Sequence, residues 1–254
     1  MTNSTLELIH KHASVRRYKP DPVPIPIIET IVQATQRAST SSNLQTYSVI
    51  AVTDATKREK LAALADNQPF ICDAPAFLVW CADLARLDRV CQLRGTIQVT
   101  EYVDNFLTAA MDAALAAQNA ALAAESLGLG MCYVGALRNN SRGVIELLGL
   151  PRLVFPLFGM TLGWPAKEAR VKPRLPLQAI LHWEKYNSDQ DAVLHEYDQT
   201  MAATGIYTGR QAPFPGREGE MENYGWLEHS ARRAARAART NLREVLEEQG
   251  FLLK

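Results

Sequence analysis

The chain has 254 residues, which is enough for one large domain or for a domain with an appendage. Its hydrophobic share of 47% and charged share of 21% are typical of a packed globular protein, and 27 basic residues balance 27 acidic ones. Because a formal net charge of zero creates no long-range field, the composition argues against nucleic acid and anionic membranes as partners.

We expect a cytoplasmic protein that does not cross a membrane. The first twelve residues lack the charged and apolar parts of a secretory signal. The longest apolar stretch, 106–127, carries polar groups that are too costly at bilayer depth. These groups are Asp112, Gln118, Asn119 and Glu125. The cysteines form no C-x-x-C pair, so buried reduced thiols are expected rather than zinc ligands or disulfides. They are Cys72, Cys81, Cys91 and Cys132.

The first half of the chain predicts alternating helices and strands. Ser4 is expected to cap a short helix over 5–12, and four prolines between 19 and 26 require an extended segment. Pro26 suits the start of a helix that ends near 37, and Asp54 suits the cap of a helix that ends near 65. The pattern of apolar residues predicts strands at 46–53, 74–82, 131–137 and 153–162.

The most distinctive predicted element is a helix over about 101–127, which Gly128 and Gly130 end. It is rich in alanine on every side, so neighbouring backbones are able to approach it closely and we expect it to be central. Larger apolar residues follow one face of this helix. They are Leu107, Met111, Leu115 and Leu122. So little solvent-facing polarity favours burial of this helix by a second subunit.

The chain changes character after residue 165. A polar helix is expected at 187–204, a loop at 205–219, and one long helix at 223–249 that is basic first and acidic later. Such a tail has too little apolar surface to be stable alone. We therefore predict a core over 1–186 and a helical extension over 187–254 that wraps a dimer partner.

Three separated segments are enriched in groups that bind anions and hydroxyls. In an extended chain, the alternating residues His12, Ser14 and Arg16 project to one side. Lys172 and Arg174 flank a proline in the same way, and a third segment at 39–43 is a run of short polar residues after a helix. Each segment alone is more simply a solvated face or an ordinary loop. Together they form a site for a phosphate and a polyol only if folding unites them.

Common catalytic motifs are missing from the sequence. There is no P-loop, no G-x-G-x-x-G after a strand, no G-x-S-x-G and no H-E-x-x-H. A hydrolase and a Rossmann-type dinucleotide clamp are therefore not supported, and no residue is predicted to act as a nucleophile.

Five short strings nevertheless resemble the nitroreductase superfamily, and most of all its oxygen-insensitive NADPH nitroreductase and flavin reductase branch. They are AALAAQN at 113–119, AESLGLG at 124–130, YVGALRN at 133–139, PLFG with LGWP at 156–165, and KPRLP at 172–176. The resemblance runs from about 6 to 207. It implies an α+β fold with a central mixed sheet flanked by helices, an intertwined homodimer, and FMN bound at the subunit interface.

The resemblance also implies roles for individual residues. His12, Ser14, Lys172 and Arg174 would lie near the FMN phosphate, and Arg16 near the pyrimidine edge of the flavin. The ribityl chain and ring would contact the following residues, some from the other subunit: Ser39, Thr40, Ser41, Gln68, Tyr133, Val134, Gly135 and Ala136. Relatives often carry a basic residue at the position of Ala13 and a glycine at that of Ala136. We therefore expect weaker binding of the phosphate here and a different backbone contact around Ala136.

The implied activity is ping-pong transfer of two electrons from NADPH to nitroaromatics, quinones or related small oxidants. Arg210 and Arg217 are the candidates for the 2′-phosphate of NADPH. A second basic group repeats at helical spacing, and a solvated face or ion pairs with glutamates explain it more simply. It consists of Arg232, Arg236, Arg239 and Arg243. Three other readings stay open: an NAD(P)H-flavin reductase, a flavin-binding protein without turnover, and a binding role for the arginine-rich helix.

Overall fold

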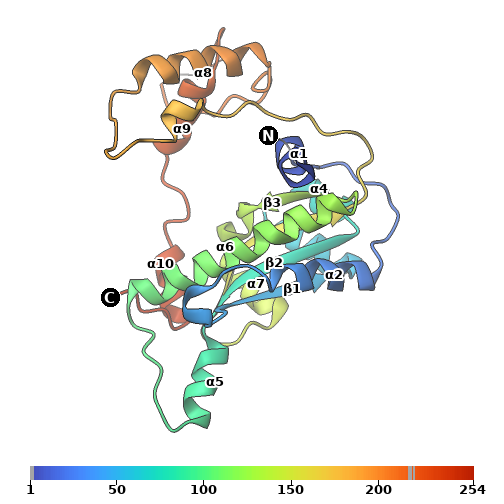
Figure 1. The fold of residues 1–254 in the computed structure, drawn as a ribbon, viewed down its shortest axis with the longest axis vertical. Helices are drawn as coiled ribbons and strands as arrows, with labels where there is room; N and C mark the ends of the chain where they lie inside the picture. Colours follow the sequence, from blue (N-terminus) through green and yellow to red (C-terminus); the bar gives the residue numbers. More distant parts are fainter. Residues whose placement is uncertain (1–2, 217–218, 220) are drawn as a thin grey trace. The chain divides into compact units, whose positions relative to one another are not determined.

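The computed structural model describes residues 3–216, 219 and 221–254. The chain divides into two compact units, one of Met1–Arg170 with Arg239–Lys254 and one of Val171–Ala238. The helices of the first unit include α1 (Ser4–Lys11), α2 (Ile25–Thr35), α3 (Ala55–Leu64), α4 (Pro69–Asp73), α5 (Ala85–Leu93), α6 (Val103–Ser126), α7 (Ser141–Leu148) and α10 (Leu242–Glu248). Figure 1 follows these elements along the chain.

Four strands form the sheet of the first unit, in the order β1-β2-β4-β3. They are β1 (Tyr47–Val52), β2 (Ala76–Asp83), β3 (Gly130–Val134) and β4 (Val154–Gly163). All three described pairings are antiparallel, so the expected α+β fold is confirmed but its sheet is antiparallel rather than mixed. The predicted strands agree with these within a few residues, except that β3 ends at Val134 and a 3₁₀ turn, Gly135–Asn140, follows.

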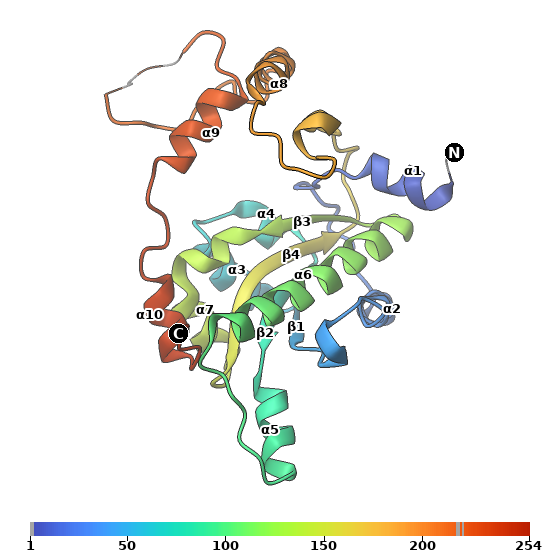
Figure 2. The ribbon, with the colours of Figure 1, turned by 60° about the vertical axis from the view of Figure 1, so that its left-hand side comes forward.

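Strand β2 is the centre of the core because all eight of its residues are buried. Leu78 and Trp80 face the layer that contains α2 and α6, whereas Phe77 and Val79 face α3 and α7 on the other side. This alternation follows from the period of two in a strand, and burial on both faces explains why β2 is a continuous apolar run. The first unit therefore has three layers, with helices on both faces of the sheet (Figure 2).

Helix α6 is central to this unit, as its alanines predict. It lies along one face of the sheet and buries a stripe of small side chains there (Figure 2). The buried alanines are Ala109, Ala113, Ala116, Ala117, Ala120, Ala121 and Ala124. Its opposite face carries larger apolar side chains that stay open to solvent, with Leu107, Met111 and Leu115 each 49–56% exposed.

The last residues of the chain complete the core of the first unit. Phe251 is 1% exposed and packs with Val245 and Leu246 of α10 against Phe155 of β4. The side-chain amide of Gln249 donates to the carbonyl oxygen of Val154, 3.0 Å away. Residues 239–254 are therefore an integral layer of their own subunit.

The second unit contains α8 (Asp191–Ala203) and α9 (Trp226–Ala234). Tyr197 packs edge-on against Trp226 with 5.3 Å between the ring centroids, and Asp198 accepts a 2.6 Å hydrogen bond from the backbone of Leu227. A pocket of about 580 Å³ lies within this unit, and Tyr207 and Tyr224 are among its lining residues.

Four details differ from the sequence-based expectation. The cap of α1 is Asn3, not Ser4. The long helix expected at 223–249 is two helices, α9 and α10, because the chain leaves helical geometry between them and Arg239 has a φ of 55°. The arginines at 232–243 therefore do not form one stripe. Of the four free cysteines, Cys81 and Cys132 are buried as expected, but Cys72 is exposed and Cys91 is half-buried.

Candidate functional site

The segment that contains His12, Ser14 and Arg16 is fixed to the start of β3. The backbone N–H of Val15 donates to the carbonyl oxygen of Met131 at 2.9 Å, and the Val15 side chain is buried. Gly130 makes this approach possible, since a Cβ there would lie 2.5 Å from a methyl group of Val15. With Val15 turned inward, Ser14 is half-buried and Arg16 is exposed. Val15 is therefore the residue of this segment that packs inward, and the common direction of His12, Ser14 and Arg16 stays a prediction.

His12 ends helix α1 and contacts the last turn of α6. Its Nδ1 lies 2.6 Å from the Oε1 atom of Glu125, and the two side chains are 26% and 12% exposed. The imidazole is therefore fixed at one nitrogen. Its Nε2 makes no hydrogen bond within residues 3–216, 219 and 221–254.

Arg16 contacts helix α4, and the loop before α4 therefore lies near the segment that contains His12, Ser14 and Arg16. Its guanidinium lies over the ring of Phe70, 5.7 Å from the centroid, and Gln68 precedes α4 two residues earlier. Asp66 and Asn67 both have positive φ, at 58° and 53°. A non-glycine residue in the left-handed backbone conformation costs about 1–3 kcal/mol of conformational free energy, and such residues cluster at functional sites. Gln68 is two residues in the chain from Phe70, whose ring Arg16 contacts.

The end of β3 supplies the next group of predicted residues. Tyr133 is 37% exposed, Val134 is buried, and Gly135 and Ala136 are half-buried. Tyr133 packs edge-on against Phe158 with 5.5 Å between the ring centroids. Burial raises the pKa of the Tyr133 phenol, and the charge of Glu125 raises it further. Tyr133 thus lies close to the pair formed by His12 and Glu125.

Arg239 contacts the residues that follow β3, and the sequence did not reveal this contact. It donates to the carbonyl oxygen of Gly135 at 3.1 Å and to the side-chain oxygen of Asn139 at 2.9 Å. Burial lowers the pKa of Arg138, and the charge of Arg239 lowers it further. Helical spacing placed Arg239 on an exposed stripe. Only its positive φ, which no sequence pattern marks, turns the side chain to the β3 turn.

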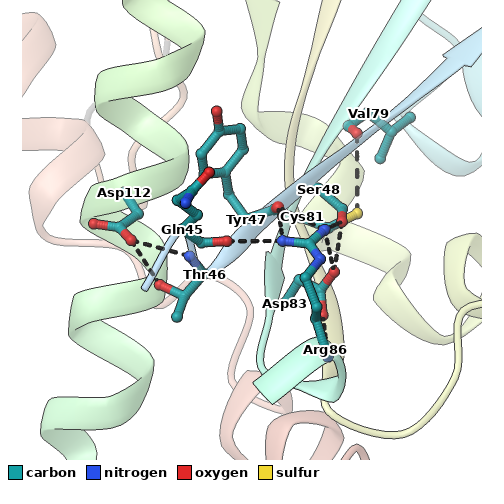
Figure 3. Close-up of polar contacts among 9 residues, drawn as sticks. All are labelled: Gln45, Thr46, Tyr47, Ser48, Val79, Cys81, Asp83, Arg86 and Asp112. Carbon is teal, nitrogen blue, oxygen red and sulfur yellow. Dashed lines mark hydrogen bonds and ion pairs between the residues drawn. The ribbon is translucent and has the colours of Figure 1, made fainter. Parts of the chain in front are cut away.

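The polar segment with Ser39, Thr40 and Ser41 lies elsewhere on the first unit. The buried carboxylate of Asp112 on α6 accepts hydrogen bonds from the backbone N–H of Ser41 at 3.0 Å and from the N–H and hydroxyl of Thr46 at 3.1 and 2.8 Å. Figure 3 shows the bonds to Thr46. Three residues of this loop have positive φ, at 49°, 57° and 55°. They are Ser42, Asn43 and Gln45. The loop is therefore held in a strained shape by one buried acid.

Arg86 supports the same loop from its other end. Its guanidinium donates to the carbonyl oxygen of Gln45 and to the hydroxyl of Ser48, both at 2.8 Å, and it pairs with Asp83 at 3.2 Å (Figure 3). The sequence analysis did not single out Arg86 or Asp83. Nothing in their spacing points to a loop that lies about forty residues earlier in the chain.

Within one chain, the loop that contains Ser39–Ser41 is far from the segment that contains His12, Ser14 and Arg16. Asp112 and Glu125 anchor the two groups to the same helix, thirteen residues apart. At 1.5 Å per residue this separation is about 20 Å. One subunit therefore unites His12, Ser14, Arg16, Gln68 and the end of β3, but not the serine and threonine loop.

The remaining predicted residues belong to the second unit. Lys172 and Arg174 are both exposed, and Arg174 donates to the carbonyl oxygen of Lys172 at 3.2 Å. Arg210 is exposed as well. Arg217 lies outside the described residues. The placement of these cations beside the flavin stays a prediction.

Replacing Asp112 with asparagine tests the hold on the serine and threonine loop. The amide keeps the size of the side chain but turns an N–H group toward backbone donors, so we expect a loss of about 2 kcal/mol in the free energy of unfolding. Urea denaturation measures this loss. Asp104→Asn, on the exposed first turn of α6, is the matched control. Equal midpoints for the two variants would show that the loop does not depend on Asp112.

Two kinds of feature are absent from the described residues. No helix among them is long and apolar enough to cross a membrane. Nor do three or more histidine, cysteine or acidic side chains gather in a metal-binding arrangement within those ranges.

The fold and the site together define a three-layer α+β protein with a basic segment packed on the end of its sheet. The family model described as "Nitroreductase family" matches residues 9–164, and "Nitroreductase family, C-terminal domain" matches 172–254. The chain belongs to the nitroreductase family.

Curated relatives cover nearly the whole chain. An "FMN reductase (NADPH)" of Bacillus subtilis is 38% identical over 98% of both chains. An "Oxygen-insensitive NADPH nitroreductase" of Salmonella typhimurium is 36% identical over 97% of this chain and 98% of the relative. The family resemblance stated from the sequence is thus confirmed.

Solved structures agree with this assignment. NfrA2 of B. megaterium superposes with a TM-score of 0.92 at 34% identity over all of both chains. The NADPH:FMN oxidoreductase of Vibrio harveyi, complexed with NAD+, has a TM-score of 0.87 at 36% identity and covers 99% of this chain and 100% of that one.

Proposed function

We propose that this protein is an FMN-dependent oxidoreductase that takes two electrons from NADPH and passes them to nitroaromatics, quinones or related small oxidants. The observation that carries the proposal is the likeness to NADPH-dependent flavin reductases and nitroreductases along the whole chain. The four free cysteines fit a reducing compartment, and we place the reaction in the cytoplasm.

The residues of the first unit fit FMN. A phosphate needs hydrogen-bond donors, which the Nε2 of His12 and the hydroxyl of Ser14 would supply from one segment. The ring needs an apolar border and backbone contacts, and the end of β3 offers both through Tyr133, Val134 and the half-buried Gly135. Lys172 and Arg174 would add positive charge from the second unit.

When bound, FMN supplies the hydride chemistry, and the protein supplies placement and electrostatics. Arg16 would hold its positive charge at the pyrimidine edge of the ring, where negative charge accumulates on reduction, and so favour the reduced state. Tyr133 and Val134 would keep the ring fixed at its border. Nicotinamide and oxidant would use the same place in turn, which gives ping-pong kinetics and needs no side-chain nucleophile.

The complete site requires a homodimer. The exposed apolar face of α6 is the kind of surface that a partner covers. If two copies of α6 pack antiparallel about a twofold axis near Gln118, the Asp112 end of one helix meets the Glu125 end of the other. The serine and threonine loop, Ser39–Ser41, would then lie beside His12 and Arg16 of the partner subunit. The separation of about 20 Å within one chain is thus resolved by a second chain.

For NADPH, Arg210 is the proposed contact of the 2′-phosphate. Thr208 and Gln211, on either side of it in the chain, both line the 580 Å³ pocket of the second unit. Arg217 is a second candidate. Comparing KM for NADPH and NADH in Arg210→Ala tests this role, and an unchanged preference would remove Arg210 from the site.

The physiological oxidant separates two forms of this proposal. A flavin reductase and a nitroreductase of this family share the same site, so the reading as an NAD(P)H-flavin reductase fits the relatives equally well. Comparing kcat/KM for free FMN, a quinone and a nitroarene decides between them. A flavin-binding protein without turnover would instead show no bleaching of its flavin band by NADPH.

Loss of flavin tests the cofactor site directly. We expect Arg16→Ala and Lys172→Ala each to retain less FMN through purification, because each removes a positive charge assigned to the flavin or its phosphate. The ratio of flavin absorbance to protein absorbance measures retention. Lys60→Ala, an exposed lysine of α3, is the control. Full occupancy in both site variants would contradict the assignment.

A further inference from the structure

Glu125 has a placement that its own helix does not favour. It lies in the last turn of α6, where the negative end of the helix dipole opposes a carboxylate. It is also largely buried, with a side chain that is 12% exposed. Burial of a charge is costly unless a partner compensates for it, so a positively charged partner is expected beside this acid.

His12 is the partner that the structure provides. Its Nδ1 approaches Glu125 Oε1 to 2.6 Å, which is a short hydrogen bond. The other oxygen, Oε2, is buried and has no hydrogen-bond partner in the described chain. His12 Nδ1 is therefore the hydrogen-bond partner of Glu125, and this bond holds the ring in one orientation.

The chemistry of imidazole then determines what Nε2 is able to do. Because Glu125 accepts the hydrogen on Nδ1, Nε2 donates to a second anion only when the ring carries both hydrogens. With a phosphate on its open side, His12 would donate from Nδ1 to Glu125 and from Nε2 to that phosphate.

We propose that Glu125 is a positioning residue that orients His12 and pairs with it when its ring donates to the phosphate of FMN. This inference rests on the FMN site proposed above, and it assigns a role to an acid that touches no part of the flavin in that proposal. Glu125 acts through His12 alone, so its effect is confined to flavins that carry a phosphate.

Two flavins separate this role from a structural one. Full-length protein freed of flavin is titrated with FMN and with riboflavin, which lacks the phosphate, and quenching of flavin fluorescence gives each dissociation constant. We expect Glu125→Gln to weaken FMN about tenfold or more, the effect of one charge-assisted hydrogen bond, and to leave riboflavin unchanged. Glu146→Gln, an exposed acid of α7, should change neither.

A double variant tests whether Glu125 acts through His12. If it does, Glu125→Gln combined with His12→Gln binds FMN no more weakly than His12→Gln alone. Additive losses, or equal loss of FMN and riboflavin in Glu125→Gln, would overturn the inference. If the unmodified protein itself shows no preference for FMN over riboflavin, the proposed phosphate site is wrong, and this outcome is distinct from a failure of Glu125 alone.

Discussion

Phe251→Ala is expected to lower the free energy of unfolding by about 3–5 kcal/mol, the usual cost of emptying a buried aromatic site. Phe251 is 1% exposed and packs edge-on against Phe106, with 5.5 Å between the ring centroids. Truncation leaves a cavity at the junction of α6, β4 and α10. Denaturant unfolding followed by circular dichroism measures the loss.

The adjacent Leu252 provides the control because it is 38% exposed. Leu252→Ala should cost less than about 1 kcal/mol, as surface substitutions do. Similar losses for the two variants would show that residues 239–254 do not form part of the core. A chain that ends near residue 185 would lose the core residues Phe251 and Val245 as well as most of the second unit, so such a truncation changes the core of the first unit together with the extension.

The helices and strands were predictable wherever a local signal decides them. Asp54 caps α3 as expected, with its carboxylate accepting from the backbone of Lys57 at 2.7 Å. The apolar run of β2 marks a strand buried on both faces, and the alanines of α6 mark a helix that packs closely. Each of these features depends on neighbouring residues in the chain, so the sequence alone is sufficient to reveal it.

The break between α9 and α10 was not predictable from local signals in the sequence. Arginines at helical spacing continue through 232–243 and predict one helix. The fold instead separates them. Arg232 is buried and pairs with Glu228 at 2.6 Å, Arg239 turns to Gly135, and Arg243 pairs with Glu247 at 2.8 Å. Of these three contacts, that of Arg239 with Gly135 is tertiary and lies where the helix is interrupted. The pairs of Arg232 and Arg243 are local, since each joins a glutamate four residues away in the same helix.

The sequence predicted the separate segments of the candidate site but not how these segments are arranged in space. The sequence marked the segment at 12–16, the loop at 39–41 and the end of β3. It did not show that Asp112 and Glu125 hold two of these segments at points thirteen residues apart on one helix. The acids that do so were visible only as polar interruptions in an alanine-rich helix, and their partners are 71 and 113 residues away.

Leu115→Glu is expected to convert the proposed dimer to monomers and to empty the flavin site without unfolding the subunit. Leu115 is 51% exposed on the free face of α6, so a carboxylate there is tolerated within one chain. At a twofold interface, two carboxylates would be buried near each other. We expect a cost of about 3 kcal/mol, which weakens the dimer roughly 100-fold. Light scattering after size exclusion measures the mass, and flavin absorbance measures occupancy.

The control must add the same charge where no partner is expected. Ala63→Glu does so at an exposed position of α3, on the opposite face of the sheet, and should leave both mass and flavin content unchanged. Because the serine and threonine loop would reach the flavin only from the second subunit, dissociation and loss of FMN should occur together in Leu115→Glu. A stable dimer with full FMN would contradict the antiparallel pairing of α6. A monomer that retains FMN would show that one subunit is sufficient for the site.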